Sequence, residues 1–525
     1  MKRLILLWPI CLLAACSQSA WPDFNSGRYP EQGLQHGMIQ LGEKLEDPYT
    51  VENMQKALVS VYGTKAERVD ITATDLYVRF LPKDNDEYTA LLESGIYLLD
   101  HPMDYSIVKE GDYYQDPEVG DEAITWQYAV VPRDYPFPQG IRYEKLDEVY
   151  ISEHAATTRA DEGIDWALVE RESFRLTGNA ELWQEPTKAD AEVAAPEGRI
   201  TIEDPLFSGG KPFGVAGVMV AANIFVKIAT AYTDRDGYYQ MSKPFSGEPR
   251  YRLVFQNEKG FSIGFNFLIV PASVSTLGKG EAGGMDLHVT QDSEGSLFRR
   301  CVTNNAAYDY YSRCTEDDLD IAPPPSDLRL WIFPDLTCSS ANMLHHGAFM
   351  NQTLIMAYLK EYLPLVKLFL PDITIGTKEK TYAQIYETVI HEMAHASHYA
   401  QAGNDFWTPY INYILLSFVK NSRTDYGSGD EEGASYCELG EMWAYFIQET
   451  LRKDRYGGTV RQFGNTFWFK PDIFTYLYER GISRGEIFRA LKAGVATTDD
   501  LKEELISQLP DRESIITQTF QHYGK

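Results

Sequence analysis

The chain has 525 residues, of which 44% are hydrophobic, so it can bury several cores, and its length predicts about three domains. Its formal net charge is −28, and no basic cluster interrupts the acidic composition. This charge argues against nucleic acid as a partner and against binding to an anionic bilayer through a basic face.

Residues 1–15 have the pattern of a signal peptide. A basic start is followed by an apolar run at 4–13 that is too short to span a membrane. Residues 13–16, Leu-Ala-Ala-Cys, resemble the lipobox of bacterial lipoproteins. That resemblance implies cleavage before Cys16, a lipid on its thiol, and export to a lipid-anchored position in the bacterial cell envelope. An ordinary secretory signal with an incidental cysteine is the alternative. The polar residues 16–48 are expected to form a tether.

Residues 49–155 predict a small N-terminal α+β domain. Helical periodicity at 51–62 and 86–94 alternates with strand patterns at 75–81, 96–99 and 125–131. The phrases at 77–82 (Tyr-Val-Arg-Phe-Leu-Pro), 101–104 (His-Pro-Met-Asp) and 126–131 (Trp-Gln-Tyr-Ala-Val-Val) resemble the N-terminal module of uncharacterised lipoproteins from Bacteroides-type bacteria. This resemblance implies a location in the cell envelope, as for other lipoproteins, but it does not indicate a reaction. His101 is interpreted as a turn residue.

Residues 156–196 predict a helical linker, whose helix at 165–176 ends before Gly178. Residues 197–275 then change to short strands, and the turn from Thr233 to Tyr238, Thr-Asp-Arg-Asp-Gly-Tyr, resembles the carboxypeptidase-regulatory, transthyretin-like domains. That resemblance implies a β-sandwich that serves as a spacer or binding platform. Asp234 and Asp236 suggest calcium, but too few oxygen ligands follow them, so a turn is favoured.

Residues 276–525 are expected to form a mostly helical α+β domain. A strand is predicted at 328–333, a helix at 354–363, an extended segment at 366–375, and helices from residue 472 onwards. His345 and His346 fit a polar turn better than a second metal site. The whole chain is therefore interpreted as multidomain α+β.

The helix predicted at 381–403 carries the clearest chemical motif. It opens with a capping box, Thr381 and Gln384, and ends at a glycine. Within it, His391, Glu392 and His395 form H-E-x-x-H, which puts two imidazoles one turn apart on the polar face, as a Zn²⁺ site requires. A helix that carries two solvated or hydrogen-bonded histidines is the alternative.

A second helix, predicted at 433–455 and ending at Gly457 and Gly458, offers the third ligand. Its segment Glu441-x-x-Ala444-x-Phe446 resembles the third-ligand helix of the gluzincin metallopeptidases, in particular their lethal-factor-like branch. The resemblance covers at most about the last 200 residues of the chain. It implies a zincin-like domain with one Zn²⁺ per chain, held by His391, His395 and Glu441.

Three other side chains compete for a place at the metal. Glu438 lies one turn before Glu441 and is the alternative carboxylate. Cys437 lies on the right face, although a buried structural thiol is the simpler interpretation. His398 lies one turn beyond His395, so we expect it to be a pocket or supporting group.

Zinc with three protein ligands keeps a position for water, and Glu392 is placed to take that water's proton. The predicted reaction is hydrolysis of peptide bonds in a peptide or protein, glycoproteins included. Tyr426, Tyr436 and Tyr445 are candidate oxyanion donors, and the sequence does not choose among them. The alternatives are a non-catalytic protein that binds a protein or glycan on a zincin scaffold, and an amidase that acts on cell-wall peptides.

Four cysteines follow the signal and the lipobox, namely Cys301, Cys314, Cys338 and Cys437. In an oxidising compartment they allow two disulfides, and Cys301 with Cys314 would close a local loop. Free buried thiols are the alternative. The sequence does not predict the oligomeric state.

Overall fold

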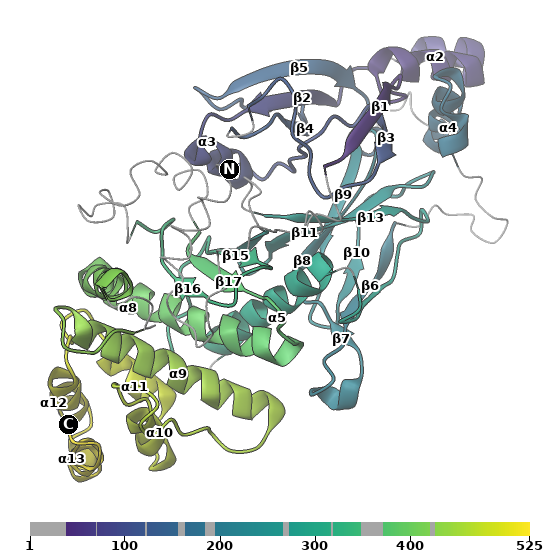
Figure 1. Ribbon diagram of the computed structural model, residues 1–525. Coiled ribbons are helices and arrows are strands. Elements are labelled where there is room, and N and C mark those ends of the chain that lie inside the picture. Colours follow the sequence, from purple (N-terminus) through teal and green to yellow (C-terminus); the bar gives the residue numbers. More distant parts are fainter. Residues whose placement is uncertain are drawn as a thin grey trace, which may run out of the picture.

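The computed structural model describes residues 38–69, 71–120, 123–155, 163–183, 195–265, 272–293, 295–316, 319–347, 371–420 and 426–525 (Figure 1). The expected signal peptide, Cys16 and most of the expected tether lie outside these residues, and so does the helix expected at 354–363. Within the described residues the chain is a mixed α and β protein with several sheets, which is compatible with the predicted α+β class.

The N-terminal unit is larger than the sequence indicated. Its three-stranded antiparallel sheet has the order β4-β2-β5, formed by Gln127–Pro132, Asp75–Leu81 and Arg142–Val149. The remaining elements are β1 (Gln40–Lys44), α2 (Val51–Tyr62), α3 (Asn85–Glu93), β3 (Tyr105–Lys109) and α4 (Trp166–Leu176).

Two of these elements lie outside the expected domain at 49–155. β1, in the expected tether, pairs with β3, and α4, in the expected linker, packs against α2. The strand expected at 96–99 forms only a bridge between Leu99 and Tyr128. Sequence patterns detect an element but do not identify what it packs against, which explains these differences.

An eight-stranded mixed sheet forms the centre of the molecule, with the order β16-β17-β15-β12-β11-β8-β9 and β13 paired with β11 (Figure 1). The strands are β8 (Val218–Ile224), β9 (Lys227–Tyr232), β11 (Arg250–Asn257), β12 (Ser262–Phe265), β13 (Val274–Lys279), β15 (Arg329–Phe333), β16 (Ser340–Ala341) and β17 (Ile373–Gly376). The domain boundary expected after residue 275 falls inside β13. It therefore does not separate two sheets, because strands from both sides of it share this one.

A smaller sheet lies beside the central one, with the order β10-β6-β14 and β7 paired with β6. Its strands are β6 (Glu197–Ile202), β7 (Phe213–Gly214), β10 (Tyr238–Gln240) and β14 (Leu287–Val289). The predicted turn precedes β10. There, Asp234 Oδ1 accepts hydrogen bonds from the backbone N–H groups of Asp236 and Tyr238, each 2.9 Å long. The Asp234 carboxylate thus stabilises the turn, in agreement with the interpretation as a turn residue, which was favoured over a calcium ligand.

Helix α5 (Gly295–Thr315) was not predicted. It follows β14 of the smaller sheet and precedes β15 of the central sheet in the chain. It packs against β11, β12 and α8, and its buried side chains include the polar Arg300, Thr303 and Asn304. Polar residues lie on the buried side among the apolar ones, and this mixture weakens the periodicity that would reveal the helix.

The position of α5 also excludes the disulfide suggested between Cys301 and Cys314. Both residues are on this one helix, 13 positions apart, which at about 1.5 Å per residue separates them by about 20 Å along its axis. A disulfide requires Cα atoms within about 7 Å. All four cysteines are buried, and Cys301, Cys314 and Cys437 are free thiols.

Two long helices carry the predicted motifs below the sheet (Figure 1). α8 (Tyr382–Lys420) begins with the predicted capping box, in which Thr381 and Gln384 exchange hydrogen bonds. At Gly403 the backbone turns to φ 69°, so the first helical segment ends where predicted, and a second continues from there. α9 (Ala434–Tyr456) is flanked by Gly433 and Gly457, also as predicted.

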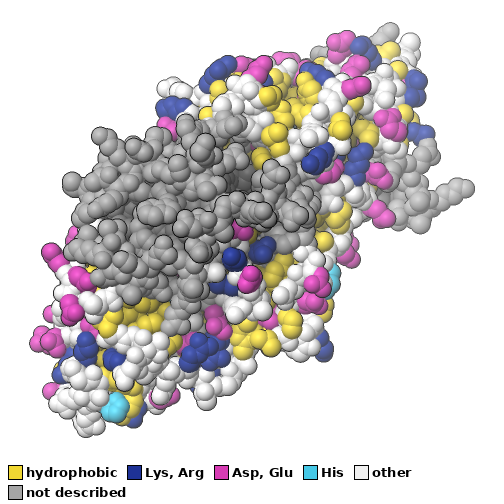
Figure 2. Space-filling view, viewed as in Figure 1, with side chains coloured by type: hydrophobic (Ala, Val, Ile, Leu, Met, Phe, Trp, Pro, Cys, Tyr) yellow, Lys and Arg dark blue, Asp and Glu magenta, His cyan; other side chains and the backbone are white. Residues whose placement is uncertain are grey.

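The C-terminal residues are mostly helical, as expected from the sequence. They form α10 (Asp472–Glu479), α11 (Arg484–Ala490), α12 (Thr498–Gln508) and α13 (Glu513–His522). Among the residues described, no helix is both long and apolar enough to cross a membrane. On the face shown in Figure 2, acidic and basic side chains of the described residues are interspersed, and no extended basic patch is visible.

Candidate metal centre

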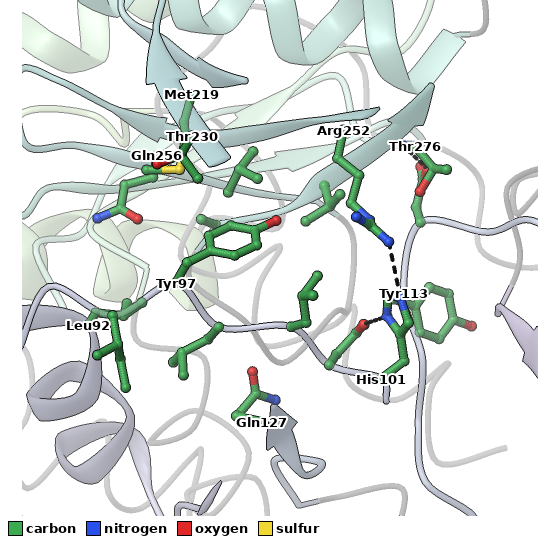
Figure 3. A pocket seen from close by; sticks show the side chains of 18 of the residues that line it. Leu92, Tyr97, His101, Tyr113, Gln127, Met219, Thr230, Arg252, Gln256 and Thr276 are labelled. Carbon is green, nitrogen blue, oxygen red and sulfur yellow. Dashed lines mark hydrogen bonds and ion pairs between the residues drawn. The ribbon is translucent and has the colours of Figure 1, made fainter. Parts of the chain in front are cut away.

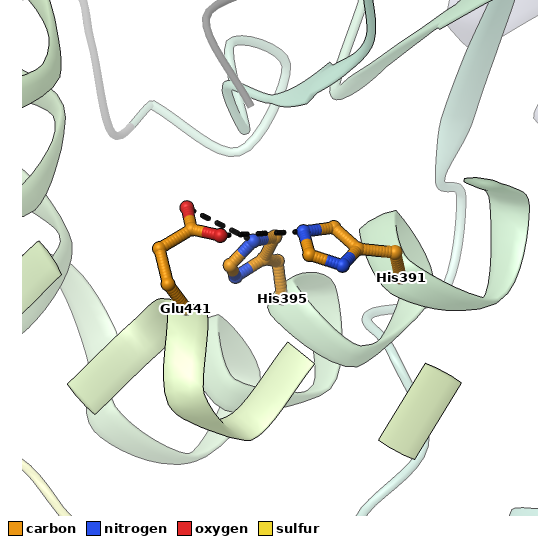
Figure 4. Close-up of side chains that lie close together, drawn as sticks. All are labelled: His391, His395 and Glu441. Atoms are coloured by element: carbon orange, nitrogen blue, oxygen red, sulfur yellow. Dashed lines mark ion pairs between the residues drawn. The ribbon is translucent and has the colours of Figure 1, made fainter. Parts of the chain in front are cut away.

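His391 and His395 on α8 and Glu441 on α9 come together between the two helices (Figure 4). Their candidate ligand atoms all lie within 4.8 Å of one another. His391 Nε2 lies 3.3 Å from Glu441 Oε2, and His395 Nε2 lies 3.5 Å from Glu441 Oε1. All three side chains are buried. Residues from two separate sequence motifs therefore form one group.

The antiparallel packing of α8 and α9 sets this register. The indole of Trp443 donates a 3.2 Å hydrogen bond to the carbonyl of Ala394, which ties the helices together at the level of the site. Gly440 permits the close approach, because a Cβ there would lie 3.1 Å from the ring of Tyr410. The indole of Trp443 and the absent side chain of Gly440 thus both contribute to the close packing of the two helices.

The hydrogen bonds of the group fit a bound cation. His391 Nδ1 lies 3.1 Å from Gln448 Oε1, which suits a proton on Nδ1 and leaves the Nε2 lone pair directed at Glu441. His391 Nε2, His395 Nε2 and Glu441 Oε2 are buried and have no hydrogen-bond partner in the described part of the chain. Leaving such atoms unpaired costs free energy, and a cation among them would remove that cost. Two imidazole nitrogens and a carboxylate oxygen suit Zn²⁺.

The charges of the group favour an ionised carboxylate. Burial alone would raise the pKa of Glu441, but the charges of the nearby His395 and His391 outweigh it and hold that pKa well below its usual range. Burial lowers the pKa of His395, an effect that Glu441 partly offsets. A deprotonated imidazole and an ionised carboxylate are the forms that bind metal.

Glu392 is buried beside this group, and neither of its carboxylate oxygens has a hydrogen-bond partner within the described residues. Burial raises the pKa of Glu392 well above its usual value, the charge of Glu441 adds to that rise, and Lys380 opposes it. Glu392 and His391 both line a cavity of about 340 Å³.

Lys380, in the same cavity wall, was missed by the sequence analysis. Burial lowers its pKa to about 8, and the charges of Cys338 and Glu392 act in the opposite direction. Its ammonium group donates a 3.1 Å hydrogen bond to Thr388 Oγ1. No local pattern marks this lysine, because it precedes the helix and reaches the site only through the fold.

Tyr410 was missed for a related reason. Its hydroxyl donates a 2.6 Å hydrogen bond to Glu441 Oε1, but it lies beyond Gly403, where the predicted helix ends. Among the tyrosines that the sequence suggested, Tyr445 lies with its ring 4.6 Å from that of His391 and lines the cavity. Its hydroxyl lies 2.8 Å from that of Tyr426.

The competing ligands lie elsewhere. Glu438 pairs with Lys525 at 2.5 Å instead of joining the histidines, and Cys437 is a buried thiol whose pKa burial raises. His398 packs against Phe406 with ring centroids 4.3 Å apart, and burial lowers its pKa to about 3. Tyr436, the third candidate oxyanion donor, also packs against Phe406, at 5.2 Å.

His345 and His346 form a polar turn, as favoured. His345 Nε2 lies 2.7 Å from Asp327 Oδ2, and His346 Nδ1 lies 3.0 Å from Asp372 Oδ1. Each imidazole has its own carboxylate, and the described residues contain no second group that could hold a metal.

No family model matches the chain, and no curated protein or solved structure does either. The resemblances to gluzincins and to transthyretin-like domains therefore stay predictions. The case for the centre rests on its geometry: two imidazoles and a carboxylate converge, their inward atoms lack hydrogen bonds, and a second carboxylate borders an accessible cavity.

Proposed function

We propose that this protein is a zinc-dependent peptidase in which His391, His395 and Glu441 bind one Zn²⁺ and Glu392 is the general base. The observation that carries the proposal is the buried His-His-Glu group, whose inward-facing atoms lack hydrogen bonds, next to a carboxylate that borders a cavity. A zinc ion with three protein ligands lowers the pKa of a bound water towards neutrality and polarises a carbonyl.

The surrounding side chains have supporting roles. Gln448 orients the imidazole of His391, and Tyr410 orients the carboxylate of Glu441. Glu392, free of other hydrogen bonds within the described chain, accepts a proton from water and delivers it to the leaving amine. Lys380 supplies a positive charge on the same side of the cavity.

A peptide or protein substrate is chosen because the two helices resemble those of gluzincins. The cavity supports this choice through its polar lining, which includes Gln384, Thr388 and Gln448. Such groups can form hydrogen bonds with a peptide backbone. Export and lipid anchoring through Cys16 are part of the same proposal and rest on the lipobox pattern alone.

The decisive experiment compares the parent protein with Glu392→Gln and Glu387→Gln. Both glutamates are on α8 and line the same cavity, so Glu387→Gln is a matched control. Zinc content is measured by mass spectrometry of the metal, and cleavage is measured with a mixture of fluorogenic peptides. We expect stoichiometric zinc in all three proteins. We expect cleavage to fall by about 10³-fold in Glu392→Gln, because only Glu392 moves the proton, and to stay near the parent rate in Glu387→Gln.

Two results would contradict the proposal in different ways. A parent protein that binds zinc but cleaves no peptide would favour the alternative of a binding protein on a zincin scaffold. A folded parent protein that takes up no zinc would show that the His-His-Glu group has another purpose.

A further inference from the structure

A second cavity, of about 190 Å³, lies between the N-terminal unit and the central sheet (Figure 3). Its walls come from α3 and the segment that follows it on one side and from β8, β9, β11 and β13 on the other. It shares no lining residue with the cavity beside Glu392. Nothing in the proposed peptidase function uses this space.

Arg252 of β11 extends into the cavity and is 2% exposed. Its guanidinium donates to two neutral acceptors, Asn223 Oδ1 at 2.6 Å and His101 Nε2 at 3.2 Å. No carboxylate among the described residues lies within ion-pair distance of it, whereas the nearby buried Arg300 pairs with Asp112 at 2.9 Å. Buried charges are ordinarily paired, so the cavity holds a cation whose partner is missing from the described chain.

The two carboxylates in the cavity wall are already engaged by other donors. Asp100 accepts from His101 Nδ1 at 2.7 Å and from the backbone N–H of Tyr114. Asp112 accepts from Arg300 and from the backbone N–H of Thr276 at 3.1 Å. Because the Asp100 carboxylate can only accept, the imidazole proton of His101 lies on Nδ1. Nε2 is then free to accept from Arg252, and the imidazole is neutral. A guanidinium has five N–H donors, and Arg252 keeps some of them for a ligand.

Tyr97 provides a second donor from the opposite wall. Its ring extends into the cavity, and its hydroxyl points towards Arg252 (Figure 3). That hydroxyl has no hydrogen-bond partner among the residues described, and burial raises the pKa of Tyr97 to about 12, so it remains a donor at neutral pH. The rest of the wall is mixed: Leu92, Met219 and Val254 supply apolar surface, and polar side chains such as Thr230 and Gln256 lie among them.

We propose that this cavity binds a small organic carboxylate with an apolar body. The carboxylate accepts hydrogen bonds from Arg252 and Tyr97, and the apolar body packs against Leu92 and Met219. The volume is somewhat larger than the roughly 150 Å³ of a protein cavity that binds benzene, so it suits a molecule the size of benzoate. Because Tyr97 belongs to the N-terminal unit and Arg252 to the central sheet, the ligand links the two. The proposal does not depend on the metal centre.

Fluorine NMR of the full chain with 4-fluorobenzoate and with 4-fluorobenzamide tests this site. The two probes share size and shape, and only the first carries a charge. We expect the acid to bind and the amide to bind at least about tenfold more weakly, because the amide lacks the charge that pairs with Arg252. Arg252→Gln should abolish binding of the acid. Arg250→Gln is the matched control, because Arg250 is on the same strand but pairs with Glu110 outside this cavity.

Further variants cover the case in which Arg252→Gln fails to fold. Tyr97→Phe keeps the ring and removes one donor, so it should weaken binding of the acid severalfold. Met219→Trp should exclude both probes by filling the cavity. The proposal is overturned if neither probe binds, if acid and amide bind equally, or if Arg250→Gln weakens binding as much as Arg252→Gln. It is also overturned if Tyr97→Phe and Met219→Trp both leave binding unchanged.

Discussion

The hydroxyl of Tyr410 donates a 2.6 Å hydrogen bond to Oε1 of Glu441, which joins the part of α8 beyond Gly403 to the candidate metal ligand on α9. The bond occupies Oε1 and leaves Oε2, 3.3 Å from His391 Nε2, without any hydrogen bond in the described chain. Both side chains are buried. Tyr410 therefore fixes the orientation in which Glu441 faces the histidines.

Replacing Tyr410 by Phe should weaken zinc binding without unfolding the protein. Outer hydrogen-bond partners of metal ligands typically contribute about 10- to 100-fold in metal affinity, and we expect a loss in that range. Titration against a chromophoric chelator measures it. Tyr413→Phe is the control, since Tyr413 is a buried tyrosine on the same helix whose hydroxyl bonds to the carbonyl of Tyr426 at 2.7 Å. Equal zinc affinities for Tyr410→Phe and Tyr413→Phe would contradict the orienting role of Tyr410.

Glu441→Ala should lose zinc, whereas Glu438→Ala should keep it. Both glutamates are buried on α9, one turn apart, but Glu438 pairs with Lys525 and takes no part in the histidine group. Metal analysis after dialysis, with circular dichroism as a check on folding, separates the two. Retention of zinc by Glu441→Ala together with its loss from Glu438→Ala would exchange their roles.

Lys227→Met should destabilise the protein by about 3–5 kcal/mol, because it leaves the buried carboxylate of Glu170 without its ion-pair partner. Lys227 lies 3.0 Å from Glu170 on α4 and 2.5 Å from Glu153, and it ties the N-terminal unit to β9. Urea unfolding measures the loss. Lys83→Met, which breaks the pair between the exposed Lys83 and Glu87, is the control and should cost much less than Lys227→Met. Similar losses in both variants would contradict the anchoring role of Lys227.

The stabilisation by His346 should depend on pH. Burial lowers its pKa, but the hydrogen bond and charge of Asp372 outweigh burial, so the folded-state pKa lies above the ordinary value of 6.5. The contribution of the pair is therefore complete below about pH 6.5 and declines as the pH rises through the folded-state pKa. Urea unfolding of the parent protein and of His346→Asn should give a larger stability difference at about pH 5.5 than at about pH 8.5. An equal or reversed difference would contradict this prediction.

Local sequence signals predicted the ends of the two motif helices well. The capping box at Thr381, the break at Gly403 and the glycines at 433 and 457 all appear where expected, because capping acts within a single turn of backbone. The features that the sequence did not predict depend on packing between distant parts of the chain. α5 was missed because it buries polar side chains, and the boundary predicted after residue 275 falls inside β13, because strand alternation does not identify a strand's neighbours.

The sequence by itself determined that one helix would present His391 and His395 on its polar face and that a second helix would carry Glu441, since side-chain direction follows from helical periodicity. Only the tertiary structure decided that Glu441, and not Glu438, meets the histidines, and that Tyr410 and Gln448 orient the group. It also decided that Arg252 enters a cavity without a carboxylate partner in the described chain. These outcomes depend on contacts between residues far apart in the chain, which no local pattern encodes.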